Sequence, residues 1–320
     1  MQIVLVAGGA GFIGSHLCKS LLKDNYKVIC VDNFITGDKN NLKDLLKDPE
    51  FTLLEYDIIK PIQSSELGMQ SLDYIFHLAS PASPNQKSTK SYINHPIETL
   101  LANSQGTYNL LELARQFNAK FLYASSSEIY GDPAISPQKE DYFGNVNPNG
   151  IRSVYDEGKR FGEAITFSYV RKHNLDARVI RIFNTYGPIM QVDDGRVVSN
   201  FINQAIENKP ITVYGKGTQT RSLCYIEDMV LGIKLAMFIP NTKGEVFNLG
   251  NPDERSVLDI AKLIKSMAES ASEIVFEDLP IDDPKARKPD IEKAKRILGW
   301  EPKVANEDGL RKTIGYFKSI

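Results

Sequence analysis

The sequence carries no large excess of charge of either sign. Its 38 lysines and arginines stand against 40 aspartates and glutamates, which gives a net charge of −2 at pH 7. A chain of this charge does not attract nucleic acid or an anionic membrane through bulk positive potential. We therefore expect neither as a partner, and any phosphate group must be recognised by a few placed groups.

Long apolar runs and cysteine motifs are also missing. No run approaches the roughly 18 to 20 residues that a membrane span needs, and the first one, residues 3–7, is too short for a signal peptide. The three cysteines show no C-x-x-C spacing, and the four histidines are scattered. These absences predict a cytoplasmic protein with reduced thiols and no metal site.

What the sequence does contain is an alternation of short β-rich runs with helical patterns. Strands are expected at 3–6, 28–31, 51–55, 74–78, 121–124 and 178–182, and helices at 13–23, 97–117 and 154–173. Several strand runs are apolar without alternation, as in strands that helices cover on both faces. The pattern predicts an α/β fold with a Rossmann-type doubly wound parallel sheet.

The pattern changes after about residue 181, where loops become longer. Further helices are expected at 198–208, 227–238, 258–270 and 291–298. Ser256 and Asp259 form a capping-box pattern at the start of the third of these. We interpret residues 1–180 as one lobe and residues 181–320 as a smaller α/β substrate-binding lobe, with interleaved segments. The charged loop at 282–290 is typical of a solvated connector.

The turn after the first expected strand is rich in glycine. Gly8, Gly11 and Gly14 form a G-x-x-G-x-x-G pattern that opens the first helix. Such a turn lets the backbone approach a pyrophosphate, which then lies on the free N–H groups of the helix N-terminus around Phe12 and Ile13. The alternative is a glycine turn with a structural role alone.

Asp32 ends the next expected strand, 18 residues beyond Gly14, close to the ~20 typical of a carboxylate that holds an adenosine ribose. A carboxylate here repels a 2′-phosphate, and no arginine follows directly, so the sequence favours NAD over NADP. The neighbours assigned to the same site are Asn33, Phe34, Thr36 and Gly37. Asp57 and Ile58 follow the third strand and are placed near the adenine, although an acid there is equally typical of a turn.

Tyr155 and Lys159 are four residues apart and so share one face of a helix. They follow Ser126, which emerges at the carboxyl end of a strand, where open α/β sheets bind ligands. For Tyr155 to take a proton from a substrate hydroxyl near neutral pH, its pKa must fall from about 10 by ~3 units. Lys159 and a positive nicotinamide ring are the expected sources of that field, and Ser126 would share a hydrogen bond with the same hydroxyl. The alternative is an exposed pair on an ordinary helix.

Together these motifs resemble those of the extended short-chain dehydrogenase/reductase family of nucleotide-sugar epimerases, dehydratases and decarboxylases. The resemblance rests on the glycine turn, His77-Leu-Ala-Ser80, Asn103, Ser125 to Gly131, Tyr155 with Lys159, and residues 181–188. Residues 77–84, 127–133, 144–148, 155–160, 194–201 and 287–290 look like the UDP-glucuronate decarboxylase subgroup. The resemblance implies bound NAD, UDP-glucuronate as substrate and usually a homodimer.

The resemblance also implies roles for single residues. Glu128 and Arg287 match the glutamate and arginine that the family brings to decarboxylation; a surface acid and a solvated loop charge are the alternatives. Further cofactor contacts are expected from Leu78, Ala79, Ser80, Asn103, Ala124, Tyr155, Lys159 and Thr185. Substrate contacts are expected from Pro81, Ser126, Glu128, Asn184, Arg196, Ser199, Asn200, Val213, Tyr214, Arg221 and Arg287. Residues 98–101 contain no lysine, although many decarboxylases carry lysines there.

Three functions remain open at this point. The first is NAD-dependent conversion of UDP-glucuronate to UDP-xylose through a 4-keto intermediate. The second is a 4,6-dehydratase or a 4-epimerase of the same family: dehydratases of dTDP-glucose use an Asp-Glu pair that Ser127 breaks, whereas those of GDP-mannose carry Ser-Glu. The third is a dinucleotide-binding sensor without catalysis. The intact Tyr155 and Lys159 argue against it, because a sensor does not need an activated phenol.

Overall fold

A seven-stranded parallel sheet forms the centre of the protein. The computed structural model describes residues 1–63, 70–279 and 287–320. The strands run in the order β11-β6-β5-β4-β1-β2-β3. Their bounds are β1 (Ile3–Ala7), β2 (Lys27–Asp32), β3 (Phe51–Glu55), β4 (Tyr74–His77), β5 (Lys120–Ser126), β6 (Ala177–Ile182) and β11 (Val246–Leu249). The doubly wound sheet is confirmed, with six strands where the sequence predicts them; β11 was missed.

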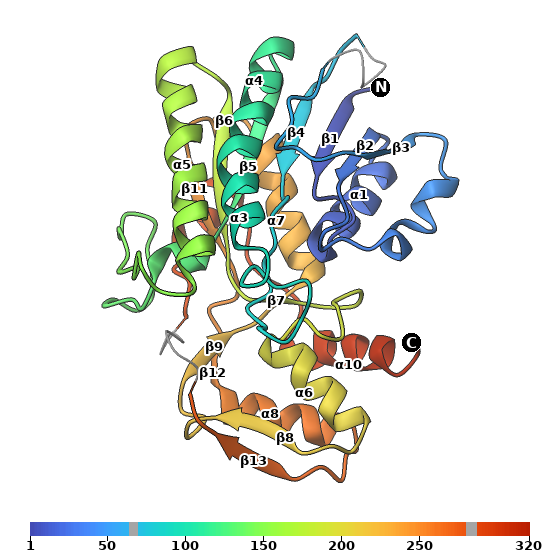
Figure 1. Cartoon of the computed structure of the whole chain (residues 1–320), viewed down its shortest axis with the longest axis vertical. Coiled ribbons are helices and arrows are strands. Elements are labelled where there is room, and N and C mark those ends of the chain that lie inside the picture. Colours follow the sequence, from blue (N-terminus) through green and yellow to red (C-terminus); the bar gives the residue numbers. More distant parts are fainter. Residues whose placement is uncertain (64–69, 280–286) are drawn as a thin grey trace.

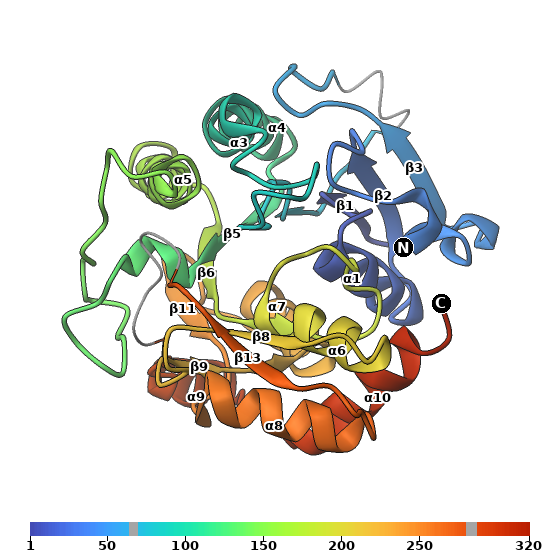
Figure 2. The same ribbon diagram turned by 60° about the horizontal axis from the view of Figure 1, so that its bottom comes forward.

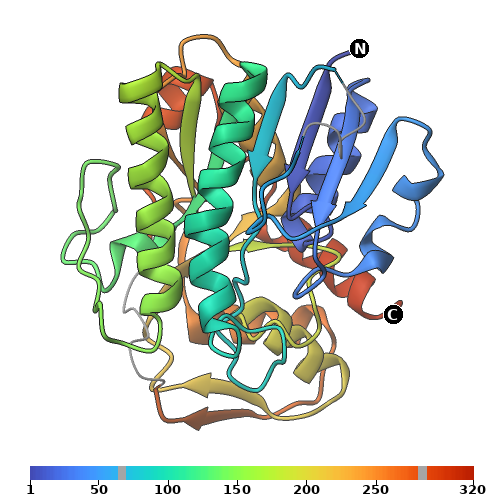
Figure 3. The same cartoon turned by 45° about the horizontal axis from the view of Figure 1, so that its top comes forward.

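Helices cover both faces of this sheet. On one face lie α3 (Pro96–Leu101), α4 (Thr107–Phe117) and α5 (Ser153–His173), and on the other α1 (Phe12–Lys23) and α7 (Ile226–Phe238) (Figures 2 and 3). The helix predicted at 97–117 is two α-helices joined by a π-helical turn, Ala102–Gly106. Both α7 and β11 come from after residue 180, so the sheet layer draws on both predicted lobes, and the boundary itself stays a prediction.

Most of the remaining elements form a layer below the carboxyl ends of the strands (Figure 1). It contains α6 (Val197–Ile206), α8 (Val257–Met267), and β8 (Ile211–Tyr214) paired with β13 (Ile274–Glu277). Smaller pairs join β9 (Thr220–Ser222) to β12 (Glu254–Ser256) and β7 (Thr185–Tyr186) to β10 (Cys224–Tyr225). Two helices, α9 (Glu292–Leu298) and α10 (Asn306–Phe317), end the chain. Sequence patterns predicted α6, α7, α8 and α9 but neither the short strand pairs nor α10.

The predicted cap of α8 is present in a modified form. The hydroxyl of Ser256 accepts a hydrogen bond from the backbone N–H of Asp259 at 3.0 Å and donates to the Asp259 carboxylate at 2.6 Å. The carboxylate therefore closes the box onto the hydroxyl rather than onto the Ser256 backbone. One continuous apolar core runs from the α1 and α7 side of the sheet, where Trp300 is buried against α7, into the lower layer. This core holds the lower layer against the sheet.

Candidate active site

A large cleft of about 1190 Å³ lies between the carboxyl ends of the strands and the lower layer. Of the predicted site residues, Gly8, Gly11, Phe12, Ile13, Gly14, Thr36, Leu78, Ser80, Ala124, Ser126, Glu128, Tyr155, Lys159, Asn184, Thr185, Arg196, Asn200, Tyr214, Arg221 and Arg287 line it. The others, Asp32, Asn33, Phe34, Gly37, Asp57, Ile58, Ala79, Pro81, Asn103, Ser199 and Val213, do not form its wall. Most of the predicted residues are thus brought to one cleft.

Close packing explains the glycines of the first turn. Gly8 has a φ of +82°, and a Cβ there would lie 2.6 Å from the backbone nitrogen of Ala79. At Gly14 a Cβ would lie 2.1 Å from the carbonyl oxygen of Gly8. Helix α1 starts after Gly11 with no side-chain cap, so its first N–H groups face the cleft without a partner from a capping side chain. The turn fits the diphosphate of a dinucleotide.

The carboxylate of Asp32 is held in place at the end of β2. It is 7% exposed, and its two oxygens accept hydrogen bonds from the backbone N–H groups of Ala10 and Phe34, each at 2.9 Å. Burial raises the pKa of Asp32, and these hydrogen bonds oppose the rise. A Cβ at Gly37 would lie 2.7 Å from Asp32 Oδ1, so the glycine leaves room beside the carboxylate. Asp57 instead accepts from the backbone N–H of Ile59, as in a turn.

Asn103 is fully buried in the π-helical turn and contacts the predicted residue Ser80 rather than the cleft. Its amide nitrogen donates to the hydroxyl of Ser80 at 2.8 Å, and its amide oxygen accepts from the hydroxyl of Tyr123 at 2.8 Å. π-helical turns are frequent at functional sites. Here the turn carries the residue that positions Ser80 on the cleft wall.

Tyr155 and Lys159 lie on the cleft-facing side of α5. The Lys159 ammonium donates to the carbonyl oxygen of Ala124 at 2.8 Å and lies 5.6 Å from the centre of the Tyr155 ring. The ring of Tyr92 stacks on that of Tyr155 at 5.1 Å. The exposed-pair alternative is therefore wrong, because Tyr155 is 8% and Lys159 3% exposed.

The surroundings of this pair set its protonation. Burial lowers the pKa of Lys159 to about 7, against the attraction of Glu163. Burial raises the pKa of Tyr155, while the Ser126 hydroxyl and the charge of Arg196 lower it. The net effect of these protein groups is a raised pKa of Tyr155, so the predicted fall does not come from the protein's own side chains.

Glu128 lies between two arginines at the end of the cleft. It follows β5 in the short 3₁₀ turn η4 (Ser127–Tyr130), and its Oε2 accepts from Arg152 at 2.5 Å and from Arg287 at 3.2 Å. Burial opposes ionisation of Glu128, but the two guanidinium groups outweigh it and hold the pKa of its carboxyl well below the usual range. Glu128 is a carboxylate at every physiological pH.

The structure corrects the interpretation of the 282–290 segment where it can be described. Arg287 is 2% exposed, and it donates to the carbonyl oxygen of Gly131 at 2.5 Å as well as to Glu128. The expectation of a solvated connector is therefore wrong at Arg287, because this side chain spans from the C-terminal part of the chain to η4. Residues 282–286 lie outside the described residues.

Sequence reasoning missed Arg152, which lines the cleft three residues before Tyr155. No local motif marks it, because its importance depends on its contact with Glu128. Lys87 and Lys90 were also missed; both line the cleft, and within the described residues neither ammonium has an ion pair or hydrogen bond. They give the cleft wall cationic groups that residues 98–101 do not supply.

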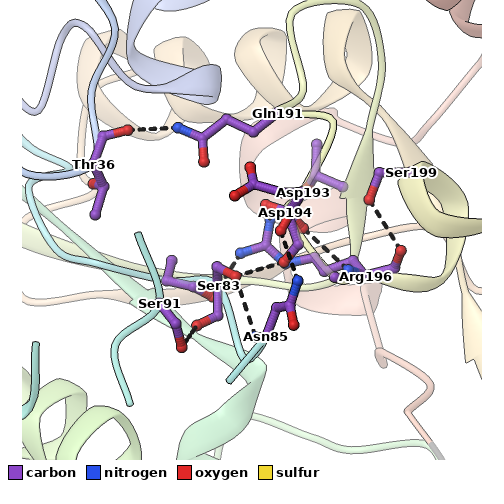
Figure 4. A network of polar contacts seen from close by, with 12 residues as sticks. Thr36, Ser83, Asn85, Ser91, Gln191, Asp193, Asp194, Arg196 and Ser199 are labelled. Carbon is purple, nitrogen blue, oxygen red and sulfur yellow. Dashed lines mark hydrogen bonds and ion pairs between the residues drawn. The ribbon is translucent and has the colours of Figure 1, made fainter. Parts of the chain in front are cut away.

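Two segments meet across the cleft in the network of Figure 4. Ser83 and Asn85, after β4, donate to the backbone oxygens of Asp194 and Asp193 at 2.5 and 2.9 Å. Arg196 donates to the backbone oxygen of Ala82 at 2.8 Å and to the Asp194 carboxylate at 3.3 Å. Part of the Arg196 guanidinium is thus used to join the two segments, in addition to its place on the cleft wall.

Two other features of the described residues bear on the class of site. No group of three or more His, Cys, Asp or Glu side chains in the described ranges is arranged to hold a metal ion. Within the same ranges, none of the helices is long and apolar enough to cross a membrane.

Comparison with known proteins gives consistent matches along the chain. Residues 4–250 match the family described as the NAD dependent epimerase/dehydratase family. The chain is 48% identical to UDP-glucuronic acid decarboxylase 1 of Xenopus tropicalis over 98% of this chain and 72% of that protein. It is 47% identical to UDP-glucuronic acid decarboxylase 3 of Arabidopsis thaliana over 96% and 86% of the two chains. Its fold is similar to the crystal structure of UDP-glucuronic acid 4-epimerase from Bacillus cereus in complex with UDP-glucuronic acid and NAD, with a TM-score of 0.88, 30% identity and 99% of each chain covered.

Proposed function

Because this chain belongs to the NAD-dependent epimerase/dehydratase family, we propose that it decarboxylates UDP-glucuronate to UDP-xylose. The observation that carries the proposal is the buried contact of Glu128 with Arg152 and Arg287 beside Tyr155. Epimerisation at C4 needs neither Glu128 nor Arg287, because only the face of hydride transfer changes. Decarboxylation, in contrast, requires groups that bind the sugar carboxylate and assist its release as carbon dioxide, and Glu128 and Arg287 are suited to this.

The residues around the first turn fit NAD. Gly8, Gly11 and Gly14 allow close approach of the diphosphate, and Asp32, held at the end of β2, would accept from the ribose hydroxyls. Leu78, Ser80 and Thr185 would form the wall along the cofactor. When bound, NAD accepts hydride from the sugar C4 and later returns it.

Tyr155 is the group that holds and moves the proton of the C4 hydroxyl. The Ser126 hydroxyl lies close enough to Tyr155 to lower the pKa of the phenol, so the two hydroxyls would contact the same substrate oxygen. Lys159 supports the ionised phenol by its charge. After oxidation the sugar is a β-keto acid, and loss of carbon dioxide leaves an enolate whose oxygen Tyr155 and Ser126 stabilise.

Arg152 and Arg287 bind and orient the carboxylate of the substrate before it leaves. Guanidinium–carboxylate hydrogen bonds are charge-assisted and directional. Glu128, held ionised between them, orients a water or handles the proton that C5 receives afterwards. Asn184, Asn200, Tyr214 and Arg221 on the lower part of the wall are placed for the nucleoside diphosphate.

Product analysis tests this function. Purified protein with NAD and UDP-glucuronate is expected to release carbon dioxide and UDP-xylose in equal amounts. UDP-galacturonate without carbon dioxide would instead indicate the 4-epimerase. Turnover of dTDP-glucose or GDP-mannose, with none of UDP-glucuronate, would overturn the proposal in favour of a dehydratase.

We also propose that the protein is a homodimer that pairs through α3, α4 and α5. The exposed side chains Ile97, Leu101, Tyr108 and Phe161 on these helices support this interface. Light scattering should give twice the chain mass, and Phe161→Glu should give the monomer.

A cytoplasmic location is supported by the three buried cysteines, which are free thiols although Cys18 and Cys30 are neighbours.

A further inference from the structure

Three buried polar atoms near Glu128 have no hydrogen-bond partner within the described residues. They are Oδ1 of Asp156, the hydroxyl of Tyr92 and Nε of Arg287. An unpaired buried polar group destabilises the folded state, so native proteins keep few of them, and those few require an explanation. Their gathering around one charged cluster indicates that the cluster is built for something besides its own stability.

Asp156 is the most unusual of the three because it is an acid. It follows Tyr155 on α5, is 6% exposed, and forms no ion pair with any other residue that the structure describes. Its carboxyl does not line the cleft. The charged and titratable groups that face it are Glu128 of η4, Arg152 at the start of α5, Arg287 of the C-terminal segment, Glu157 and Tyr155 of α5, and Tyr92 of the segment after β4.

These surroundings disfavour a second negative charge. Burial and the charge of Glu128 raise the pKa of Asp156 to about 8, although Arg152 and Arg287 oppose the rise. Both arginines already contact Glu128, and neither forms an ion pair with Asp156 within the described residues. Asp156 nevertheless lies one turn of α5 from Arg152, because its backbone N–H donates to the Arg152 carbonyl oxygen at 3.1 Å.

The charge of the cluster depends on the protonation of Asp156. Two arginines and one ionised Glu128 give +2 − 1 = +1 when Asp156 is neutral. Ionisation of Asp156 brings the total to zero. Only the first state keeps a positive charge for an incoming anion.

We propose that Asp156 is a positioning residue kept in its neutral form, so that Glu128, Arg152 and Arg287 retain one positive charge for the carboxylate of the substrate. The inference rests on the proposed function and extends it to how an acidic sugar is selected. Ionisation of Asp156 weakens binding of a carboxylate substrate, and by linkage carboxylate binding makes Asp156 take up a proton. Ionised Asp156 would repel the bound carboxylate as a neighbouring negative charge. At an effective dielectric constant between those of protein and water, this repulsion raises Kd about tenfold once Asp156 is fully ionised.

Calorimetry with two ligands that differ in the carboxylate tests this. Binding of UDP-glucuronate and of UDP-xylose is measured between pH 6.5 and about 9 in buffers of different ionisation heat, with NAD-loaded Tyr155→Phe protein so that the acid is not turned over. We expect Kd for UDP-glucuronate to rise about fivefold by pH 9, with proton uptake greatest between about pH 8 and 9. UDP-xylose should show neither effect.

Variants assign the effect to Asp156. In the same background, Asp156→Asn should bind UDP-glucuronate without this pH dependence and without proton uptake; Asp156→Ser serves if the asparagine variant fails to fold. The matched control is Glu157→Gln, which removes the half-exposed neighbouring acid on α5 and should keep the pH dependence.

The outcomes separate this inference from the function on which it rests. Equal pH dependence for UDP-glucuronate and UDP-xylose, or an unchanged dependence in both Asp156 variants, would overturn the role of Asp156 and leave the decarboxylase intact. Binding of UDP-xylose with none of UDP-glucuronate at any pH would overturn the proposed function and this inference together.

Discussion

Replacing Arg287 by methionine should separate the two chemical steps of the proposed reaction. Methionine fills much of the same buried volume but offers no donor to the substrate carboxylate. A hydrogen bond to a charged group contributes about 1.5–3 kcal/mol, so carbon dioxide release should slow by about 10- to 150-fold. Oxidation at C4 depends on Tyr155, Ser126 and Lys159 and should slow much less.

The fold should survive this change with a measurable loss of stability. Arg287 donates to the carbonyl oxygen of Gly131 and to Glu128, and the variant leaves the first without that donor. Glu128 keeps its contact with Arg152, so it is not left as an isolated buried charge. We expect a loss of about 1–3 kcal/mol in the free energy of unfolding.

Rapid mixing distinguishes the steps. NAD-loaded Arg287→Met is mixed with carboxyl-labelled UDP-glucuronate, and NADH absorbance and released label are followed together. NADH should accumulate while release of label lags. Equal slowing of both signals would refute the reasoning and give Arg287 a role in binding the diphosphate. Arg311→Met, which removes an exposed arginine from α10, is the control and should change neither.

Three other changes test separate parts of the site. Tyr155→Phe should abolish the NADH transient while UDP still binds, and a surviving transient would assign proton transfer to another group. Gly14→Ala should lose NAD binding, because its Cβ meets the Gly8 oxygen, whereas Gly315→Ala on α10, with nothing within 4 Å, should bind NAD normally. Lys159→Met should be inactive, yet without NAD it should unfold at a higher temperature than the unchanged protein near pH 7, because it buries no charge. Burial lowers the pKa of Lys159 from 10.5 to about 7, so folding favours the neutral lysine. The gain in unfolding temperature should therefore shrink as pH rises from about 7 to 10.5.

Sequence patterns predicted the parts of the site that depend on local chain geometry. The glycine turn, Asp32 and the Tyr155–Lys159 pair each occur at a fixed place relative to a strand or helix, and periodicity predicts those elements. The π-helical turn at Asn103 was not foreseeable in this way, because Ala102–Gly106 is mostly polar and its sequence does not distinguish a π-helical turn from an α-helix. The short pairs such as β9 with β12 were missed because three-residue strands have too few residues for an alternating pattern.

Contacts between distant segments were beyond the sequence patterns. Arg152 has no motif of its own, and Arg287 lies in a stretch whose charges and prolines are typical of an exposed loop. Both are buried because Glu128 and the backbone of η4 offer acceptors that satisfy a guanidinium. Only the tertiary fold brings these groups together.

The origin of the two arginines suggests how the steps of the reaction are divided over the chain. The residues proposed for oxidation, Ser126, Tyr155 and Lys159, all come from the sheet and α5, and so does Arg152. Arg287 alone comes from the C-terminal segment, and it reaches Glu128 only when that segment packs against η4. Its neighbour strengthens this attachment, because the backbone N–H of Lys288 donates to the side chain of Gln138 at 2.9 Å. In a nearly neutral chain, the local positive charge thus arises because the segments that carry Arg152 and Arg287 meet at the carboxylate of Glu128. A change that loosens the attachment of residues 287–288 should therefore reduce decarboxylation before it reduces oxidation.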